Sequence, residues 1–248
     1  MNRFEGKAAI VTGGARGIGE AIVNRLLSEK AASVAIFDLN ENLAKETAAR
    51  LDPAGKRTMV LGVNVGIGEQ VADAVKSVVE AFGKIDVLIN NSGITCDKMF
   101  HKMQNDEWDR VINVNLNGVY YVCREVFPVM REAGGGRIVN IASISAFGNV
   151  GQSNYAASKA GVIGLTRTLA LEGGRKNITA NCIAPGYIFT DMLKSIPQKA
   201  LDEYVREIPL GRFGQPEEIA STAAFLASDD AAYISGQTII VSGASRIV

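Results

Sequence analysis

The sequence predicts an α/β fold with one doubly wound parallel sheet of about seven strands and helices on both faces. Three observations predict it. Apolar runs of strand length alternate with longer segments of helical period along almost the whole 248-residue chain. Most of these runs are continuous rather than alternating, as expected for strands buried on both faces. The strict βαβα order then favours parallel strands joined by crossover helices.

The expected elements follow this rhythm. Strands are expected at residues 7–12, 33–38, 58–65, 85–90, 137–142, 179–184 and 238–241. Helices are expected at residues 18–28, 41–51, 69–82, 107–132, 155–171 and 217–227. Segment 187–214 has a helical stretch that leads into no strand, so it is expected to be a substrate-side insertion, or lid, over the C-terminal edge of the sheet. No linker or repeat divides the chain, and residues 1–248 are expected to form a single domain.

Composition and charge exclude several function classes. The 26 Lys and Arg side chains balance 26 Asp and Glu side chains, which leaves no basic footprint for nucleic acid. With His101 as the only His, a site with several His ligands is excluded, and no metal is expected. Cys96, Cys123 and Cys182 are odd in number and scattered, which favours reduced thiols in the cytoplasm. No signal-peptide pattern or 18-residue apolar run is present, so no membrane partner is expected.

A glycine-rich stretch joins the first expected strand to the first expected helix. Gly13, Gly17 and Gly19 are spaced as G-x-x-x-G-x-G, which differs from the G-x-G-x-x-G fingerprint. The same physics applies, because glycines permit a tight turn that brings a pyrophosphate close to the N–H groups at a helix N-terminus. A tight turn without a ligand is the alternative, but the position between strand and helix favours a nucleotide.

Asp38 bears on which dinucleotide binds. It ends the second expected strand, where a carboxylate can accept hydrogen bonds from ribose hydroxyls and repel a 2′-phosphate. Arg16 in the glycine loop could instead reach a 2′-phosphate. A third interpretation is that Asp38 only caps the following helix. We expect NAD(H), with NADP(H) as the alternative.

Tyr155 and Lys159 are four residues apart on one expected helix and share a face. A cation beside a phenol favours the phenolate and lowers the pKa of the tyrosine, as acid–base catalysis requires. An ordinary surface hydrogen bond or cation–π contact is the alternative. Ser143 and Gly93 follow two expected strands at the same C-terminal edge of the sheet. These two residues and the Tyr155–Lys159 pair are therefore expected to lie around one cleft, or mouth, at that edge.

Together, the glycine loop, the run Asn90-Asn91-Ser92-Gly93, Ser143, Tyr155-x-x-x-Lys159 and Pro185-Gly186 resemble the short-chain dehydrogenase/reductase family over essentially the whole chain. The resemblance implies a Rossmann-type fold. Finer matches resemble 3-oxoacyl-[acyl-carrier-protein] reductases and acetoacetyl-CoA reductases. These matches are Gly93-Ile94-Thr95, Trp108-Asp109, Asn115-Leu116, Gly151-Gln152, Asn154-Tyr155 and Thr190-Asp191-Met192.

The resemblance implies a role for each catalytic residue. Tyr155 would exchange the proton with the carbonyl or hydroxyl oxygen, and Ser143 would hydrogen-bond that oxygen. Lys159 would bind the nicotinamide ribose and lower the pKa of Tyr155. Asn115, on the helix expected at 107–132, would hold a water that relays protons through Lys159.

The expected cofactor-binding set extends along several loops. Within it, Asn91 and Gly93 would line the adenosine side, while Asn64 and Val65 would meet adenine. Ile188 and Thr190 would contact the nicotinamide carboxamide. The full set is Gly13, Arg16, Gly17, Ile18, Gly19, Asp38, Leu39, Asn64, Val65, Asn91, Gly93, Tyr155, Lys159, Pro185, Gly186, Ile188 and Thr190.

Several positions depart from the family pattern. Ser92 stands where Ala is usual, and the interval from Ser143 to Tyr155 is one residue shorter than the commonest spacing, which leaves Ser145 as a rival serine. Cys96 stands where acyl-carrier-protein reductases carry Arg, and Asp38 is unlike their NADP preference. These departures favour a catabolic or accessory NAD enzyme. His101 is expected to have a surface or packing role. Three apolar residues, Met192, Leu193 and Ile196, could form a substrate lid.

The leading functional hypothesis is therefore an NAD(P)(H)-dependent oxidoreductase that interconverts a ketone and a secondary alcohol, with a 3-oxoacyl thioester as the candidate substrate. A dehydrogenase of a sugar, a steroid or another small alcohol is the first alternative. A non-catalytic nucleotide-binding scaffold is the second. The helices at 107–132 and 155–171 resemble those through which the family forms tetramers, so a cytoplasmic homotetramer is expected.

Overall fold

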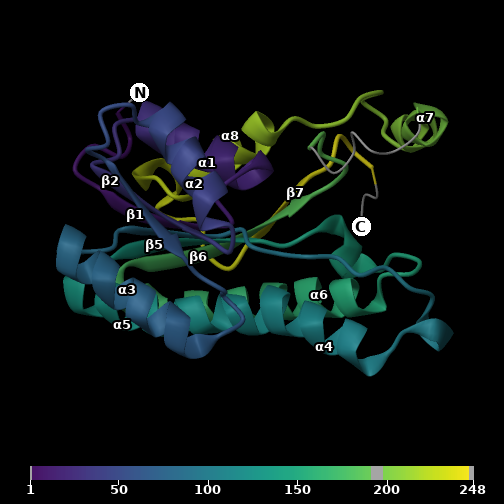
Figure 1. Cartoon of the computed structure of the whole chain (residues 1–248), viewed down its shortest axis with the longest axis horizontal. Coiled ribbons are helices and arrows are strands. Elements are labelled where there is room, and N and C mark those ends of the chain that lie inside the picture. The colour runs from purple at the N-terminus through teal and green to yellow at the C-terminus, as the bar shows by residue number, and fades with distance from the viewer. Residues whose placement is uncertain (1, 191–197, 246–248) are drawn as a thin grey trace.

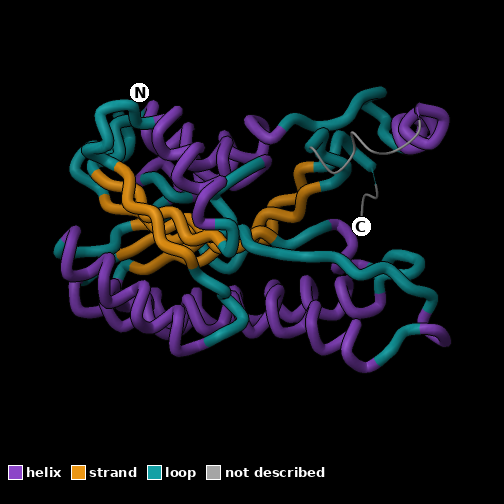
Figure 2. The backbone as a smooth tube through the Cα atoms, viewed as in Figure 1, coloured by secondary structure: helices purple, strands orange, loops and turns teal. Residues whose placement is uncertain are grey.

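The computed structural model describes residues 2–190 and 198–245. Seven parallel strands form one sheet in the order β3-β2-β1-β4-β5-β6-β7, with helices on both faces (Figures 1 and 2), which confirms the expected fold class. The strands are β1 (Ala8–Thr12), β2 (Ser33–Asp38), β3 (Thr58–Gly62), β4 (Val87–Asn90), β5 (Gly136–Ile141), β6 (Ile178–Pro185) and β7 (Thr238–Val241). The strand order reverses between β1 and β4, and ligands bind at such a switch point in open α/β sheets.

The helices form two layers (Figure 1). Helices α1 (Gly17–Ser28), α2 (Glu41–Leu51) and α8 (Pro216–Leu226) cover one face of the sheet. Helices α3 (Gly68–Phe82), α4 (Asn105–Ile112), α5 (Gly118–Ala133) and α6 (Ser153–Gly173) cover the other, and α7 (Gln198–Arg206) lies at the end of the molecule. Each face has its own apolar core cluster, because the central strands are buried on both sides.

The helix expected at 107–132 is interrupted. Helix α4 ends at Ile112, a π-helical segment spans Asn113–Asn117, and α5 begins at Gly118. A π-helical turn inserts one residue into the helical repeat, a feature found often at functional sites. Here the asparagine side chains bond outside the helix: Asn113 Nδ2 donates to the carbonyl of Gly66 (3.1 Å), and Asn115 bonds the backbone of Ile94. Apolar periodicity does not report such an insertion.

Local hydrogen bonds correct one expected strand end and exclude one alternative interpretation. The strand expected at 58–65 ends at Gly62, since Asn64 Oδ1 accepts from the N–H of Gly66 (3.0 Å) and turns the chain. Asp38 does not cap α2. That cap is Asn40, whose Oδ1 accepts from the N–H of Leu43 (3.1 Å). In the described part of the chain, no helix combines the length and the hydropathy that spanning a bilayer requires.

Candidate active site

The glycine loop has the backbone geometry that a phosphate site needs. Gly13 adopts φ +64°, a left-handed conformation that favours glycine. At Gly19, a Cβ atom would lie 1.9 Å from the carbonyl oxygen of Gly13, so no side chain fits there. Arg16 precedes α1 and makes no capping bond with its side chain. The glycine loop therefore packs tightly against the N-terminus of α1, and the two form a cradle that fits a dinucleotide pyrophosphate.

Residues that follow the neighbouring strand β4 hold this loop in place. Asn91 Nδ2 donates to the carbonyls of Thr12 (3.1 Å) and Gly13 (3.0 Å). The backbone N–H groups of Asn91 and Ser92 both donate to Thr12 Oγ1 (3.0 Å each). The structure thus gives the Asn91 side chain a supporting contact to the glycine loop. Thr12 on β1 accepts these bonds, and the sequence analysis did not single it out. Its place at the end of a buried strand could have identified it.

Asp38 lies beside the same loop. Its Oδ2 accepts from the N–H of Ala15 in the glycine loop (3.0 Å), and its Oδ1 accepts from the N–H of Asn40 (2.9 Å). These two bonds fix the carboxylate against the loop at the C-terminal end of β2. Leu39, which follows it, is exposed. An acidic group is therefore held at the edge of the cradle by the backbone of the loop that it borders.

Ser143 and Tyr155 come together over β5. Ser143 begins a 3₁₀ turn and accepts from the N–H of Ser145 with its Oγ (3.1 Å). The Ser143 hydroxyl, and not that of its rival Ser145, acts on the Tyr155 phenol and lowers its pKa. Burial outweighs this effect and raises the pKa of Tyr155 above its usual value, and the charge of Asp97 raises it further. The expectation of a lowered Tyr155 pKa is therefore wrong. Burial disfavours the phenolate more than Ser143 favours it.

Lys159 lies one helical turn after Tyr155 and is buried. Its Nζ is 5.6 Å from the centre of the Tyr155 ring and donates to the carbonyl of Ile141 on β5 (2.7 Å). Burial lowers the pKa of Lys159 to about 8, and Cys182 opposes that shift. The pair therefore makes the cation–π contact that was one of the alternatives, but Lys159 is buried and not on an exposed helix surface.

Asn115 lies in the π-helical segment, behind Gly93. Its Oδ1 accepts from the N–H of Ile94 (2.8 Å), and its Nδ2 donates to the carbonyl of Ile94 (2.9 Å) and to Ser158 Oγ (3.3 Å). A Cβ atom at Gly93 would be 3.4 Å from both Asn115 Oδ1 and Lys159 Nζ. Because Gly93 has no side chain, the segment after β4 can lie close to the side chains of both Asn115 and Lys159.

Asn154 is a positioning residue that the sequence analysis quoted only within a motif. Its Nδ2 donates to the carbonyls of Cys96 (3.0 Å) and Glu107 (3.1 Å), while its Oδ1 accepts from the N–H of Tyr155 (2.7 Å). This fully buried side chain ties the start of α6 to the segment that follows β4. It therefore fixes the backbone from which Tyr155 projects.

The outer cofactor residues are spread around the mouth. Pro185 ends β6, and the N–H of Gly186 donates to the carbonyl of Val241 (2.9 Å). Ile188 is buried and pairs with Gly214 in an isolated bridge. Thr190 approaches the glycine loop, since a Cβ at Gly17 would be 3.7 Å from Thr190 Cγ2. Val65 is buried, whereas the side chain of Asn64 makes the local turn described above and Ile18 packs against the core.

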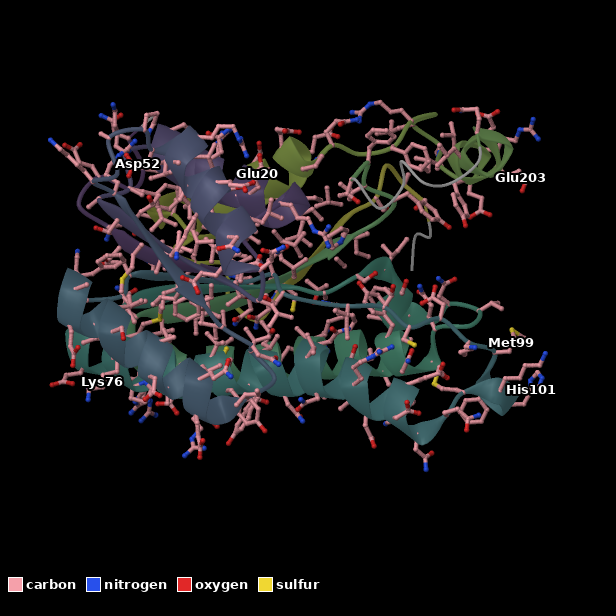
Figure 3. All side chains as sticks on the ribbon, viewed as in Figure 1. Glu20, Asp52, Lys76, Met99, His101 and Glu203 are labelled. Carbon is pink, nitrogen blue, oxygen red and sulfur yellow. The ribbon has the colours of Figure 1, made fainter. Side chains whose placement is uncertain are left out.

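The remaining candidates lie at the rim. His101 is exposed and lies at the outer end of the segment between β4 and α4, directed away from the sheet (Figure 3). Cys96 is half-buried and accepts from Arg110 Nη2 (3.2 Å). Met192, Leu193 and Ile196 lie outside the described residues. Among the described residues, no group of three or more His, Cys, Asp or Glu side chains could hold a metal ion.

Comparison with known proteins gives a consistent assignment. Residues 13–244 match the family model described as enoyl-(acyl carrier protein) reductase. The chain is 46% identical to a 3-oxoacyl-[acyl-carrier-protein] reductase of Chlamydia muridarum, over 96% of each chain. It is 44% identical to the enzyme of the same name from Thermotoga maritima, over 97% of this chain and 98% of the relative. It is 45% identical to an acetoacetyl-CoA reductase of Shinella zoogloeoides, over 98% and 99%. The chain belongs to the short-chain dehydrogenase/reductase family and is an oxidoreductase that interconverts a ketone and a secondary alcohol.

Proposed function

We propose that the protein reduces the ketone of a 3-oxoacyl thioester, reversibly, with NAD(H) as its cofactor. The observation that carries this proposal is the convergence of Ser143, Tyr155 and Lys159 on the mouth that the glycine loop also borders. The thioester class comes from the relatives, whose names specify acyl-carrier-protein and CoA substrates. When bound, the nicotinamide supplies or accepts the hydride.

The protein side of the reaction follows from the site. Tyr155, with a pKa raised by burial, is protonated at neutral pH and donates its proton to the ketone oxygen. Ser143 hydrogen-bonds the same oxygen and stabilises the negative charge that develops on it. Lys159 holds the nicotinamide ribose and presents a positive charge beside the phenol after proton loss. Asn115, which bonds the Ile94 backbone beside Gly93 and Lys159, would hold the water that relays protons through Lys159.

The substrate class is best tested by measuring turnover of a panel of ketones. We expect 3-oxoacyl thioesters of CoA and of acyl carrier protein to be reduced with a higher kcat/KM than sugars or steroid ketones. The readout is loss of reduced nicotinamide absorbance, with both NADH and NADPH. A higher kcat/KM for a sugar or a steroid would replace the thioester assignment with the alternative one.

Asp38 is expected to select NAD(H), because a fixed carboxylate repels a 2′-phosphate. In Asp38→Asn, an amide oxygen remains to accept from the N–H of Ala15 or Asn40, but the charge is gone. We expect the ratio of kcat/KM with NADPH to that with NADH to rise by about tenfold, or about 1.4 kcal/mol. Initial-rate measurements with both cofactors give this ratio.

Glu41→Gln is the matched control. Glu41 carries the same charge three residues later and pairs with Lys45 (2.6 Å) in the first turn of α2. Its neutralisation should leave the cofactor ratio unchanged. A parent enzyme that prefers NADPH, or an unchanged ratio in Asp38→Asn, would contradict the NAD(H) assignment and favour a role for Arg16 at a 2′-phosphate.

We further propose a cytoplasmic homotetramer of single-domain chains, with segment 187–214 as the substrate-side insertion, of which residues 191–197 lie outside the described residues. Closed symmetry is the default for soluble oligomers. Helices α5 and α6 offer exposed apolar side chains for contacts between subunits, Tyr120 and Leu171 among them. Light scattering that gave the mass of one chain would contradict the tetramer.

A further inference from the structure

The side chain of Thr47 on α2 reaches the glycine loop, although none of the roles above uses it. Thr47 is 2% exposed, and α2 lies beside α1 on the same face of the sheet (Figure 1). A threonine inside a helix commonly turns to solvent or bonds the carbonyl four residues back in its own helix. The hydroxyl of Thr47 instead donates to the carbonyl of Ala15 (2.7 Å), 32 residues earlier in the chain. This bond joins α2 to the loop that precedes the neighbouring helix.

Ala15 is buried and is held on both sides. Its N–H donates to Asp38 Oδ2 (3.0 Å), and its carbonyl accepts from Thr47 Oγ1. These two groups belong to different peptide units, because the N–H is part of the Gly14–Ala15 unit and the carbonyl is part of the Ala15–Arg16 unit. Asp38 therefore fixes the first unit, and Thr47 fixes the second.

The hold on the Ala15 carbonyl also sets the direction of the Arg16 N–H. The described peptide bonds are all trans, and in a trans unit the N–H points opposite to the carbonyl. Since the Ala15 carbonyl points at α2, the Arg16 N–H points away from α2. Within residues 2–190 and 198–245, no protein group accepts this N–H. Arg16 immediately precedes α1, so this N–H is a free donor at the helix N-terminus that borders the cradle.

The hydroxyl of Thr47 is itself fixed. It has one proton, and the Ala15 carbonyl is its acceptor. Its oxygen accepts from Arg50 Nη2 (3.4 Å), one turn later on α2, and the same Nη2 pairs with Glu20 Oε1 on α1 (2.9 Å). A hydroxyl turned away from Ala15 would leave a buried carbonyl without a partner, which is costly.

We infer that Thr47 is a positioning residue for dinucleotide binding: by holding the Ala15–Arg16 peptide unit, it keeps the Arg16 N–H available to an oxygen of the dinucleotide. Thr47 and Asp38 act differently. The Asp38 carboxylate distinguishes NADH from NADPH by its charge, whereas the uncharged Thr47 affects a part of the loop that both dinucleotides meet. The inference rests on the proposed binding of the cofactor at the glycine loop.

Dinucleotide affinity in Thr47→Val tests the inference, because valine keeps the size of the side chain and removes its hydroxyl. The Ala15–Arg16 unit is then free to turn, and the apparent affinity falls with the fraction of molecules that keep the binding orientation. One hydrogen bond corresponds to about three- to tenfold. We expect the Kd values for NADH and NADPH, measured by calorimetry, to rise together by this factor.

Two further readouts separate positioning from a general loss of structure. The ratio of the two Kd values should stay as in the parent, in contrast to the changed cofactor ratio expected for Asp38→Asn. In steady-state kinetics, the KM for the dinucleotide should rise by the same factor as its Kd, while kcat at saturating dinucleotide stays unchanged. Ser143, Tyr155 and Lys159 are untouched by the substitution.

The chain offers a rescue variant and a matched control. Thr47→Ser keeps the hydroxyl and should restore most of the affinity. Thr222→Val removes the hydroxyl of a half-buried threonine on α8, which bonds the carbonyl of Glu218 in its own helix (3.1 Å), and it should leave both Kd values unchanged. Thr47→Ala removes the same hydroxyl with a smaller side chain, and it replaces Thr47→Val if the valine variant does not fold.

Parent-like Kd values in Thr47→Val or in its alanine replacement would overturn the inference. A loss of affinity that Thr47→Ser does not restore would overturn it as well, since the hydroxyl would then not be the cause. The proposed function fails in a different way. A parent enzyme that prefers NADPH, or that reduces no thioester, refutes that proposal, while the ratio of variant to parent Kd with either dinucleotide still decides the role of Thr47.

Discussion

Replacing Tyr155 by Phe is expected to lower kcat by about 10²–10⁴-fold, the range that a positioned acid–base group supplies. The phenyl ring keeps the volume of the side chain and its position above Lys159, but it cannot exchange a proton with the substrate oxygen. Ser143 is unchanged and remains available to the substrate oxygen. Steady-state kinetics together with dinucleotide binding, measured by fluorescence or calorimetry, provide the test.

The binding measurement makes the Tyr155→Phe result specific. Dinucleotide affinity should stay within a few fold of the parent value, because the glycine loop and Asp38 are unchanged. Tyr121→Phe removes a hydroxyl from a half-buried tyrosine of α5 and should leave kcat unchanged. Unchanged turnover in Tyr155→Phe would refute the acid–base role, and lost dinucleotide binding would show a structural role instead.

Among glycine-to-alanine substitutions in the glycine loop, Gly19→Ala is expected to weaken cofactor binding most. Its Cβ would lie 1.9 Å from the carbonyl oxygen of Gly13 and 2.6 Å from Asn91 Nδ2, so the loop backbone must move. We expect dinucleotide affinity to fall by about tenfold or more, and the free energy of unfolding to fall by about 1–3 kcal/mol. Calorimetric titration and urea denaturation measure the two effects.

Gly174→Ala controls for the loss of glycine itself. Gly174 follows α6 with φ −55° and ψ −44°, and a Cβ there would meet nothing within 4 Å. It should bind dinucleotide normally and be unchanged or stabilised by up to about 1 kcal/mol. If Gly19→Ala bound dinucleotide as tightly as Gly174→Ala, the glycine loop would not be the pyrophosphate site.

Much of the fold could be predicted from the sequence because central parallel strands are buried on both faces. Strand 33–38 therefore appears as a nearly continuous apolar run with correct ends. The ends of strand 238–241 are also correct, although it lies at the edge of the sheet and is only partly buried. The break between α4 and α5 could not be predicted in this way. It depends on hydrogen bonds from the side chain of Asn113 to Gly66, 47 residues away in the sequence, and from that of Asn115 to Ile94, 21 residues away. Local periodicity does not encode such bonds.

The candidate site was predictable where a residue type itself carries the chemistry. Tyr155, Lys159 and Ser143 could be identified by their spacing and by their place at strand ends, and the structure brings them together. The direction of the Tyr155 pKa shift was not predictable, since it depends on how deeply the phenol is buried. The supporting roles of Thr12 and Asn154 depend on tertiary hydrogen bonds and were missed for the same reason.

Transfer of a labelled hydride distinguishes an oxidoreductase from a nucleotide-binding scaffold. The protein is incubated with a 3-oxoacyl thioester and with reduced dinucleotide that carries deuterium at the transferred position of the nicotinamide. We predict a 3-hydroxyacyl product with one deuterium on its carbinol carbon, detected by mass spectrometry, and far less product with Tyr155→Phe. Tight dinucleotide binding with no deuterium transferred to any ketone in the panel would contradict the account.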